Sequence, residues 1–241
     1  MSTYVLVHGA WRGGWIWKRV RSQLQAHGHE VFTPTLTGVG ERSHLLSREI
    51  NLETHIVDVI NLVRWEELSD IVLCGHSYGG CVVTGVADRI PEKIGALVYV
   101  DAFVPDSGQS LHDTLPMEDR NQQLEAARTV GNGWKTPPIP AEVFNVNVRD
   151  RDWVEKQSTL HPLACFQEPL NLTGAIYRIE NITYILANGW SPSPFPQFYD
   201  KAKARRWKTL ILASGHDVML DQPKELTREL LAISARASGT R

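Results

Sequence analysis

A glycine-rich turn that follows an apolar run decides the fold predicted by this sequence. Residues 71–80 read IVLCGHSYGG, so four apolar residues lead directly into the pattern G-x-S-x-G, and residues 81–87 continue as an apolar segment with helical spacing. The small residues around Ser77 let a strand and a helix approach closely, and such a turn exposes the serine hydroxyl. The stretch therefore predicts a buried strand, a sharp turn that carries a nucleophilic serine, and a helix.

Apolar runs and helical segments alternate on both sides of this stretch. The predicted strands are short, and several are apolar at consecutive positions, which indicates burial on both faces of a parallel sheet. The predicted strands cover residues 4–8, 29–34, 70–76, 96–101, 182–188 and 209–214. The predicted helices cover residues 15–27, 52–66, 78–89, 198–206 and 223–234. We therefore expect an α/β fold with about six mostly parallel strands and helices on both faces.

The stretch between the fourth and fifth predicted strands carries no good strand signal. Residues 105–180 contain helix-like pieces at 117–130 and 141–149, separated by a proline-rich break at 136–140. An interruption of about 75 residues is too long for a loop of a compact domain. We expect residues 1–104 and 181–241 to form the α/β core and residues 105–180 to form an inserted helical cap.

Composition and charge exclude several classes of protein. The 241 residues include 25 basic and 27 acidic side chains, and this near balance gives no electrostatic footprint for nucleic acid. No apolar run approaches the roughly 18 residues of a membrane span, and no signal peptide is visible. Cys74, Cys81 and Cys165 are too scattered for a disulfide framework or a zinc site. We expect a cytoplasmic protein with no nucleic-acid or membrane partner, and the sequence leaves a homodimer open.

The predicted nucleophile Ser77 needs a base and an acid, because a serine hydroxyl is a weak nucleophile near neutral pH. His216 follows the last predicted strand and so reaches the sheet edge at which Ser77 emerges. Asp101 ends the fourth predicted strand at the same edge, where a buried carboxylate needs a partner. Asp217 and Asp106 are the competing carboxylates. The sequence thus predicts Ser77, Asp101 and His216 as the catalytic residues.

The loop after the first predicted strand completes the predicted site. It reads HGAWRGG over residues 8–14, and its glycines leave room for a substrate carbonyl to approach a backbone amide. We expect the oxyanion hole to consist of the amides of Ala10 and of Tyr78, the residue after Ser77. The glycine-rich turns are accounted for by this loop and by the Ser77 turn, so we expect neither a metal nor a cofactor.

Five aromatic residues are candidates for binding substrate. Four lie in the insertion or in the loop after the fifth predicted strand, and the fifth follows Ala10. Both segments should overhang Ser77, where aromatic side chains would form a flat apolar pocket for a planar acyl group. Packing of the cap onto the sheet is the alternative explanation for each side chain. The candidates are Trp11, Trp134, Trp153, Trp190 and Phe195.

Three motifs in this order resemble those of the α/β-hydrolase fold: HGAW at residues 8–11, GHSYGG at 75–80 and GHD at 215–217. The resemblance covers nearly the whole chain. Within that fold, the chain is similar to compact esterases that include the plant methylesterases and hydroxynitrile lyases. With segments such as LTGVGER at 36–42, it also resembles small bacterial esterases that cleave methyl benzimidazolylcarbamate, the fungicide carbendazim.

Two departures from the plant relatives bear on the chemistry. These relatives carry the acid after the penultimate strand, where this chain has Asn188 and Gly189. The hydroxynitrile lyases have a threonine at the position of Gly9 and a lysine at the position of Asp217. The resemblance therefore implies hydrolysis rather than cleavage of cyanohydrins.

The expected function is that of a cofactor-free serine hydrolase. The resemblance implies a short-alcohol ester or carbamate of a small aromatic or heteroaromatic compound, cleaved through an acyl- or carbamoyl-serine intermediate. The small insertion shows no long apolar stripe, which disfavours a lid for long acyl chains. Two alternatives stay open: a lyase or carbon–carbon bond hydrolase on the same scaffold, and a hydrolase-fold receptor that binds a small ligand.

Overall fold

The centre of the molecule is a parallel sheet, as the consecutive apolar residues predict. The computed structural model describes residues 1–239. Within them, six strands follow the order β2-β1-β3-β4-β7-β8, and every neighbouring pair is parallel. The strands are β1 Thr3–Val7, β2 Glu30–Phe32, β3 Ile71–Ser77, β4 Ile94–Ala102, β7 Ile182–Ala187 and β8 Lys208–Leu212. All bounds agree with the sequence prediction to within two residues.

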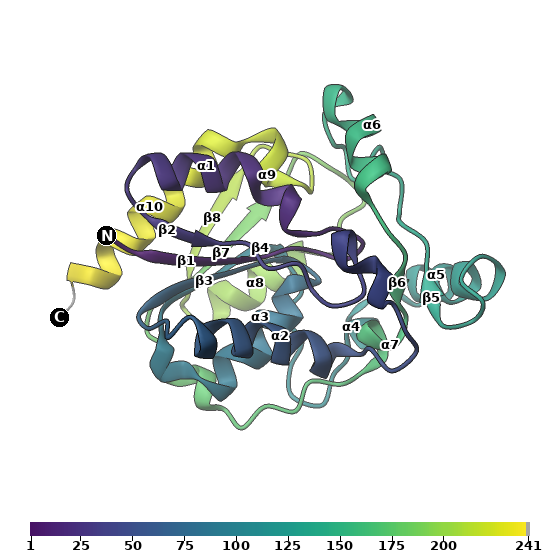
Figure 1. Ribbon diagram of the computed structural model, residues 1–241, viewed down its shortest axis with the longest axis horizontal. Coiled ribbons are helices and arrows are strands. Elements are labelled where there is room, and N and C mark those ends of the chain that lie inside the picture. The colour runs from purple at the N-terminus through teal and green to yellow at the C-terminus, as the bar shows by residue number, and fades with distance from the viewer. Residues whose placement is uncertain (240–241) are drawn as a thin grey trace.

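Helices cover both faces of the sheet, which confirms the predicted α/β fold. Figure 1 shows α1, α9 and α10 on one side and α2, α3 and α8 on the other. A capping box at Asn51, whose side chain accepts a hydrogen bond from the Thr54 amide, begins α2. The helices are α1 Lys18–Ala26, α2 Leu52–Trp65, α3 Gly79–Arg89, α8 Pro196–Ala204, α9 Val218–Asp221 and α10 Pro223–Gly239.

The two central strands lie deepest in the core. Every residue of β3 is buried, and β4 is buried at all positions but Gly95. Covered by helices on both sides, these strands show consecutive rather than alternating apolar residues. Because neighbouring strands are parallel, their carboxyl ends lie along one edge of the sheet, and this edge receives Ser77 from β3 and Asp101 from β4.

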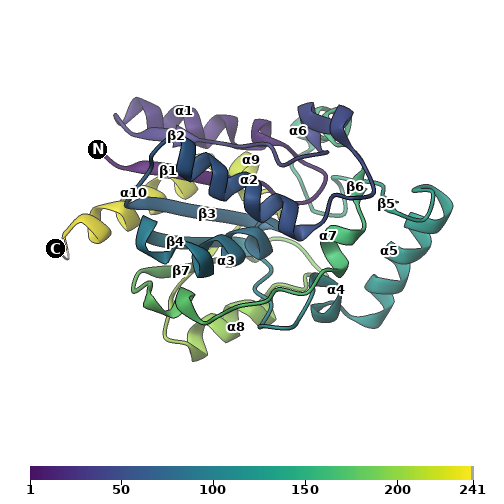
Figure 2. The same ribbon diagram turned by 60° about the horizontal axis from the view of Figure 1, so that its bottom comes forward.

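Residues 105–180 contribute no strand to the central sheet. Figures 1 and 2 show the elements up to residue 167 gathered past one end of β3 and β4. Residues 173–176 instead lie against the end of α3, where the amides of Thr173, Gly174 and Ile176 donate to Asp88. Two short strands that the sequence did not suggest pair antiparallel through Thr136 and His161. The elements are α4 Leu111–Thr114, α5 Met117–Thr129, β5 Lys135–Thr136, α6 Val148–Gln157, β6 His161–Pro162, α7 Ala164–Gln167 and the 3₁₀ helix η4 Ala175–Arg178. That these residues form a cap separate from the core stays a prediction.

The prediction of a helix over residues 141–149 is wrong. Residues 141–145 form turns, and α6 begins only at Val148. Two tertiary contacts explain the difference: the Phe144 carbonyl accepts a hydrogen bond from the His216 amide at 2.9 Å, and the Ala141 amide donates to Glu155 at 2.6 Å. Asn145 has a φ of +50°, which interrupts any helix at this point.

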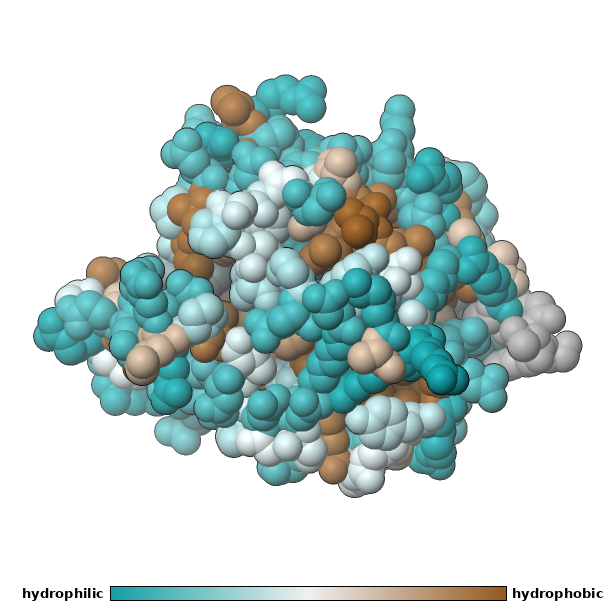
Figure 3. Space-filling model, turned by 180° about the vertical axis from the view of Figure 1, so that it is seen from behind, coloured by the Kyte–Doolittle hydropathy of each residue, from teal (hydrophilic) through white to brown (hydrophobic). Residues whose placement is uncertain are grey.

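The face of the molecule seen from behind is mostly hydrophilic and shows a hydrophobic patch among polar side chains (Figure 3). Ile211 of the edge strand β8 is 49% exposed. None of the helices described for residues 1–239 is long and apolar enough to cross a bilayer. The homodimer and the cytoplasmic location stay predictions.

The close packing of α3 gives a test of the fold. A Cβ atom added at Gly80 would lie 2.3 Å from the Phe103 carbonyl oxygen, which is backbone, whereas one at Gly85 would meet the side chain of Ile56. We expect Gly80→Ala to lower the free energy of unfolding by about 1–3 kcal/mol, because the backbone must shift. Gly85→Ala should cost less, since Ile56 can rotate and alanine favours the helix. Urea unfolding measures both, and equal costs would contradict the packing described.

Candidate active site

Ser77 is the last residue of β3, where the chain turns into α3. Its φ of +53° lies in the left-handed region that residues other than glycine rarely adopt. The register between β3 and β4 shifts at this point, so that His76 pairs with Val100 and Ser77 pairs with Ala102. Backbone strain that the surrounding packing maintains is common at functional sites. The residue is 8% exposed.

Asp101 is the residue that this shift leaves without a partner in the ladder. A bulge redirects the side chain of the residue it displaces, and Asp101 has a φ of +43° and no exposed surface. Its carboxylate accepts hydrogen bonds from the Ala187 amide at 3.1 Å, from Trp190 Nε1 at 3.0 Å and from His216 Nδ1 at 2.7 Å. Three donors compensate for the cost of burying this charge.

His216 follows β8 and reaches Asp101 from the other side of β7. Because a carboxylate can only accept, Nδ1 of His216 donates to Asp101, and Nε2 of the neutral ring keeps its lone pair. Among residues 1–239, no hydrogen bond joins the Ser77 hydroxyl to this nitrogen. Catalytic hydrogen bonds are often long without substrate. The three predicted catalytic residues thus come to one sheet edge, and Nε2 of His216 accepts no hydrogen bond from the described residues.

The two competing carboxylates make other contacts. Asp106 is exposed and pairs with Lys201 at 2.8 Å and Arg205 at 2.7 Å. Asp217 is buried and pairs with Arg12 at 3.2 Å. The His216 ring therefore meets Asp101 and neither of its competitors through a side-chain hydrogen bond.

The loop after β1 packs directly against Ser77. A Cβ atom at Gly9 would lie 2.8 Å from Cβ of Ser77. His8 Nε2 accepts a hydrogen bond from the Leu36 amide, so its Nδ1 carries the proton and donates to the Gly9 carbonyl at 2.7 Å. In a trans peptide the carbonyl and the next amide point in opposite directions, so this bond turns the Ala10 N–H away from His8. The sequence analysis missed this contact of His8. The only signal in the motif is that His8 stands next to Gly9 in the chain.

Tyr78, the second predicted donor, is fixed by a buried histidine. The ring of His55 donates from Nε2 to the Thr37 carbonyl at 2.8 Å, so its Nδ1 accepts from the Tyr78 hydroxyl at 2.8 Å. In the described chain, the amides of Ala10 and Tyr78 donate to no other group. Both stay available to a substrate oxygen.

One group of described residues has the composition of a metal site. The ligand atoms of His55, His161 and Cys165 lie within 4.8 Å of one another. However, both nitrogens of His55 already make hydrogen bonds, and Nδ1 of His161 accepts from the Trp11 amide at 3.3 Å. These contacts describe a buried hydrogen-bond network, and binding a metal would break it.

The predicted aromatic residues divide into two sets. Phe195 stacks on the His216 ring at 5.0 Å, and the Trp190 ring also lies 5.0 Å from it. Phe144, which sequence reasoning missed, lies 4.8 Å from the same ring. No periodic pattern marks this residue, because it belongs to an irregular turn.

The other three aromatic candidates lie around this cluster or away from it. Trp11 contacts Phe144 at 6.5 Å and donates from its indole to Thr136. Trp153 packs on Trp15 at 4.9 Å, and Trp134 lies under the cations of Arg48 and Lys135. The contacts of Trp134 and Trp153 therefore support the packing explanation.

A strained serine after a central parallel strand, with a histidine and a buried aspartate at the same edge, defines the architecture of an α/β hydrolase. A model of the alpha/beta hydrolase family matches residues 4–229, and the chain belongs to this family.

The similar proteins include esterases and a hydrolase. The chain is 46% identical to a carbendazim hydrolyzing esterase from Nocardioides sp. (strain SG-4G), over 97% of this chain and 100% of the relative. It is 30% identical to polyneuridine aldehyde esterase from Rauvolfia serpentina, over 96% and 95% of the two chains. An extracellular alpha/beta-hydrolase from a Paenibacillus species has the same fold, with a TM-score of 0.83 at 24% identity over 97% and 99% of the two chains. The predicted family is confirmed, and the relatives agree with hydrolysis of esters or carbamates.

Burial keeps the histidines around this site neutral. It lowers the pKa of His8 to about 3, that of His55 to about 4 and that of His76 to about 3. In the unfolded chain a histidine titrates near about 6.5. Between these values the unfolded chain binds more protons than the folded one, so acid favours unfolding.

We therefore expect the free energy of unfolding to fall steeply as the pH drops from 6.5 toward 4. His8, His55 and His76 alone give a slope of up to about 4 kcal/mol per pH unit, and burial also lowers the pKa of His161, which adds to this slope. Urea unfolding between pH 7 and pH 5 measures it. His55→Gln should make the slope shallower, whereas His27→Gln should not, because His27 is exposed. A stability that does not change over this range would show that these histidines are not buried and neutral.

Proposed function

We propose that this protein is a serine esterase that cleaves a short-alcohol ester or carbamate of a small aromatic or heteroaromatic compound, without a cofactor. The observation that carries the proposal is the buried 2.7 Å hydrogen bond between Asp101 and His216, at the sheet edge where strained Ser77 ends β3. A histidine held in this tautomer has the geometry of a general base for a serine.

In the proposed reaction, Nε2 of His216 takes the Ser77 proton as the hydroxyl oxygen attacks the substrate carbonyl. The imidazolium that forms is stabilised by the Asp101 carboxylate. The oxygen that becomes negative accepts hydrogen bonds from the amides of Ala10 and Tyr78, whose orientation is fixed before substrate arrives. The tetrahedral intermediate then collapses, and His216 gives its proton to the departing alcohol.

Water completes the proposed cycle. The same His216 nitrogen removes a proton from a water molecule as it attacks the acyl- or carbamoyl-Ser77 carbonyl. Collapse of the second tetrahedral intermediate releases the acid or carbamic acid and returns the proton to Ser77. All proton transfers pass through one side chain, so no cofactor is required.

Three observations support the substrate class. The rings of Phe144, Trp190 and Phe195 surround His216 and offer flat apolar surfaces to a planar group. The Nocardioides relative, 46% identical over its full length, is an esterase for carbendazim, a heteroaromatic methyl carbamate. The site is also nearly closed, with His216 2% exposed, which suits a small alcohol better than a long chain.

A substrate comparison tests this proposal. We expect methyl esters of aromatic acids and methyl carbamates such as carbendazim to be hydrolysed faster than a long-chain 4-nitrophenyl ester or a peptide amide. Ser77→Ala should abolish nearly all turnover while leaving circular dichroism unchanged, because the three groups act as a unit. A preference for long chains or amides would reject the substrate class, and a folded, active Ser77→Ala variant would reject the nucleophile.

The proposed role of Asp101 can be tested against a second carboxylate, Asp106, as a matched control. Asp101→Asn should lower kcat by about 10⁴-fold, since an amide cannot hold the required tautomer of His216. Asp106→Asn should leave kcat little changed, because the Asp106 carboxylate pairs with Lys201 and Arg205 near the surface rather than with His216. Steady-state kinetics on variants shown to be folded decide between them. A larger loss in Asp106→Asn would move the acid away from Asp101.

A further inference from the structure

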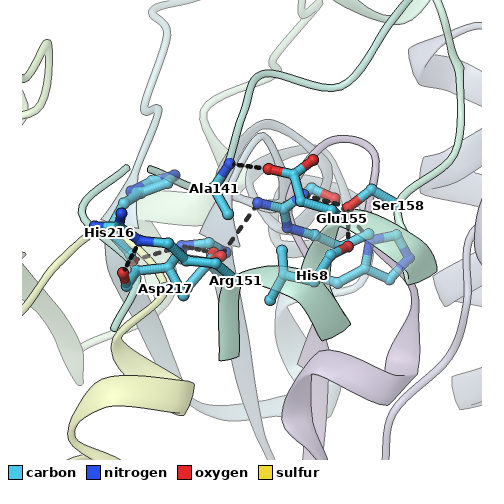
Figure 4. Close-up of polar contacts among 12 residues, drawn as sticks. His8, Ala141, Arg151, Glu155, Ser158, His216 and Asp217 are labelled. Atoms are coloured by element: carbon cyan, nitrogen blue, oxygen red, sulfur yellow. Dashed lines mark hydrogen bonds and ion pairs between the residues drawn. The ribbon is translucent and has the colours of Figure 1, made fainter. Parts of the chain in front are cut away.

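A buried ion pair between Arg12 and Asp217 adjoins His216, which Asp217 directly follows in the chain. The guanidinium of Arg12 reaches Asp217 at 3.2 Å, and the two residues are 2% and 1% exposed. Arg12 also donates from Nη1 to Oγ of Ser158 at 2.6 Å. Figure 4 shows Asp217 next to His216, with Ser158 on the far side of the same cluster.

The three residues come from three separate segments. Arg12 lies two residues after Ala10, in the loop that packs on Ser77. Asp217 directly follows His216. Ser158 follows α6 in the insertion, and the next residue, Thr159, donates its amide to the Trp11 carbonyl at 3.0 Å. One guanidinium therefore connects the predicted oxyanion loop, the His216 loop and the insertion.

Stability alone does not explain this pair. Removing two charges from water is costly, and replacing a buried ion pair by apolar residues of similar volume is often neutral or stabilising. Oδ1 of Asp217 has no hydrogen-bond partner among the described residues, so the pair is not fully satisfied. A structure that only needed packing here would lose little by dispensing with both charges.

The backbone of His216 is held by the same surroundings. Its amide donates to the Phe144 carbonyl at 2.9 Å, and its carbonyl is 3.0 Å from Nε2 of His76. The Arg12 guanidinium lies over the Phe144 ring at 5.8 Å. Arg12 thus contacts Phe144, whose carbonyl holds the His216 amide, and also contacts Asp217, the residue after His216.

We propose that Arg12 is a positioning residue, which through its two contacts with Asp217 and Ser158 fixes His216 and the Ala10 loop relative to the insertion. The inference rests on the proposed function, because it assigns Arg12 to the placement of the proposed base. Arg12 does not touch the reacting atoms. A lysine keeps the charge but presents a single ammonium, which cannot maintain the fork that holds Asp217 and Ser158 together.

The charges around His216 give the proposal a signature that packing alone would not produce. His216 contacts Asp101 and His76, and burial keeps His76 neutral. Asp217, paired with Arg12, is the next residue in the chain. Burial acts to raise the pKa of Asp217, but Arg12 and the other basic groups outweigh it and lower this pKa, so Asp217 is charged. Loss of Arg12 leaves this negative charge uncompensated and favours a protonated His216, whereas loss of Asp217 does the reverse.

The test uses the rate at which Ser77 reacts with a fluorophosphonate, together with its pH profile. We expect Arg12→Lys and the double variant Arg12→Met/Asp217→Asn to react about 10- to 100-fold more slowly than the wild type, since small displacements of the base have effects of this size. The acid limb of the profile should move to higher pH in Arg12→Met and to lower pH in Asp217→Asn. The double variant, which has no unpaired charge, keeps the test available where a single variant does not fold.

Arg19→Lys is the matched control. Arg19 also joins the core to α6, through Asp150 at 2.6 Å, but makes no contact with His216 or Asp217. It should react at the wild-type rate. Wild-type rates and an unmoved acid limb in the Arg12 variants would overturn the proposal, and so would equal slowing of Arg19→Lys, which would indicate general loosening of the insertion. A wild-type protein that the fluorophosphonate does not label at Ser77 would instead reject the proposed function.

Discussion

A carboxylate without exposed surface, Asp101, determines how the carboxyl edge of the sheet is built. Its charge is buried in a bulge of a central strand and must be compensated there. The compensating donors come from the end of β7, from the loop that follows it and from the loop after β8. The donors lie 86 to 115 residues from Asp101 in sequence, so this one charge draws distant segments together and fixes the tautomer of His216 at the edge where Ser77 lies.

The fold was predictable because its signals are local. The consecutive apolar residues of β3 and the glycines around Ser77 report burial and close packing without knowledge of the rest of the chain. Asp101 was predictable for a related reason, since the carboxyl ends of parallel strands meet at one edge. The contact of the competing carboxylate, Asp217, could not be predicted in the same way. Asp217 pairs with Arg12, which is 205 residues away in sequence.

Two residues at the site that the sequence did not reveal, Phe144 and His8, lie in or contact segments of irregular backbone. Phe144 packs on His216 from a turn that was expected to be helical, and one of the contacts that replace the helix joins its carbonyl to the His216 amide. His8 fixes the peptide between Gly9 and Ala10 through its tautomer, which depends on the amide of Leu36 in another loop. Neither periodicity nor spacing encodes such contacts. The aromatic candidates show the same limit, because Trp134 and Trp190 look alike in sequence and only Trp190 lies at His216.

The electrostatic balance of the site suits the proposed chemistry. Burial keeps His8, His55 and His76 uncharged near neutral pH, and the charges of Arg12 and Asp217 largely cancel. Asp101 is then the dominant fixed charge near His216. In the proposed reaction a positive imidazolium and a negative oxygen appear together. The imidazolium is stabilised by Asp101. The negative oxygen is stabilised by backbone amides, which carry no net charge and need no reorientation. An extra cation near Ser77 would stabilise the oxygen but oppose the imidazolium, so a neutral surrounding with one buried carboxylate serves both.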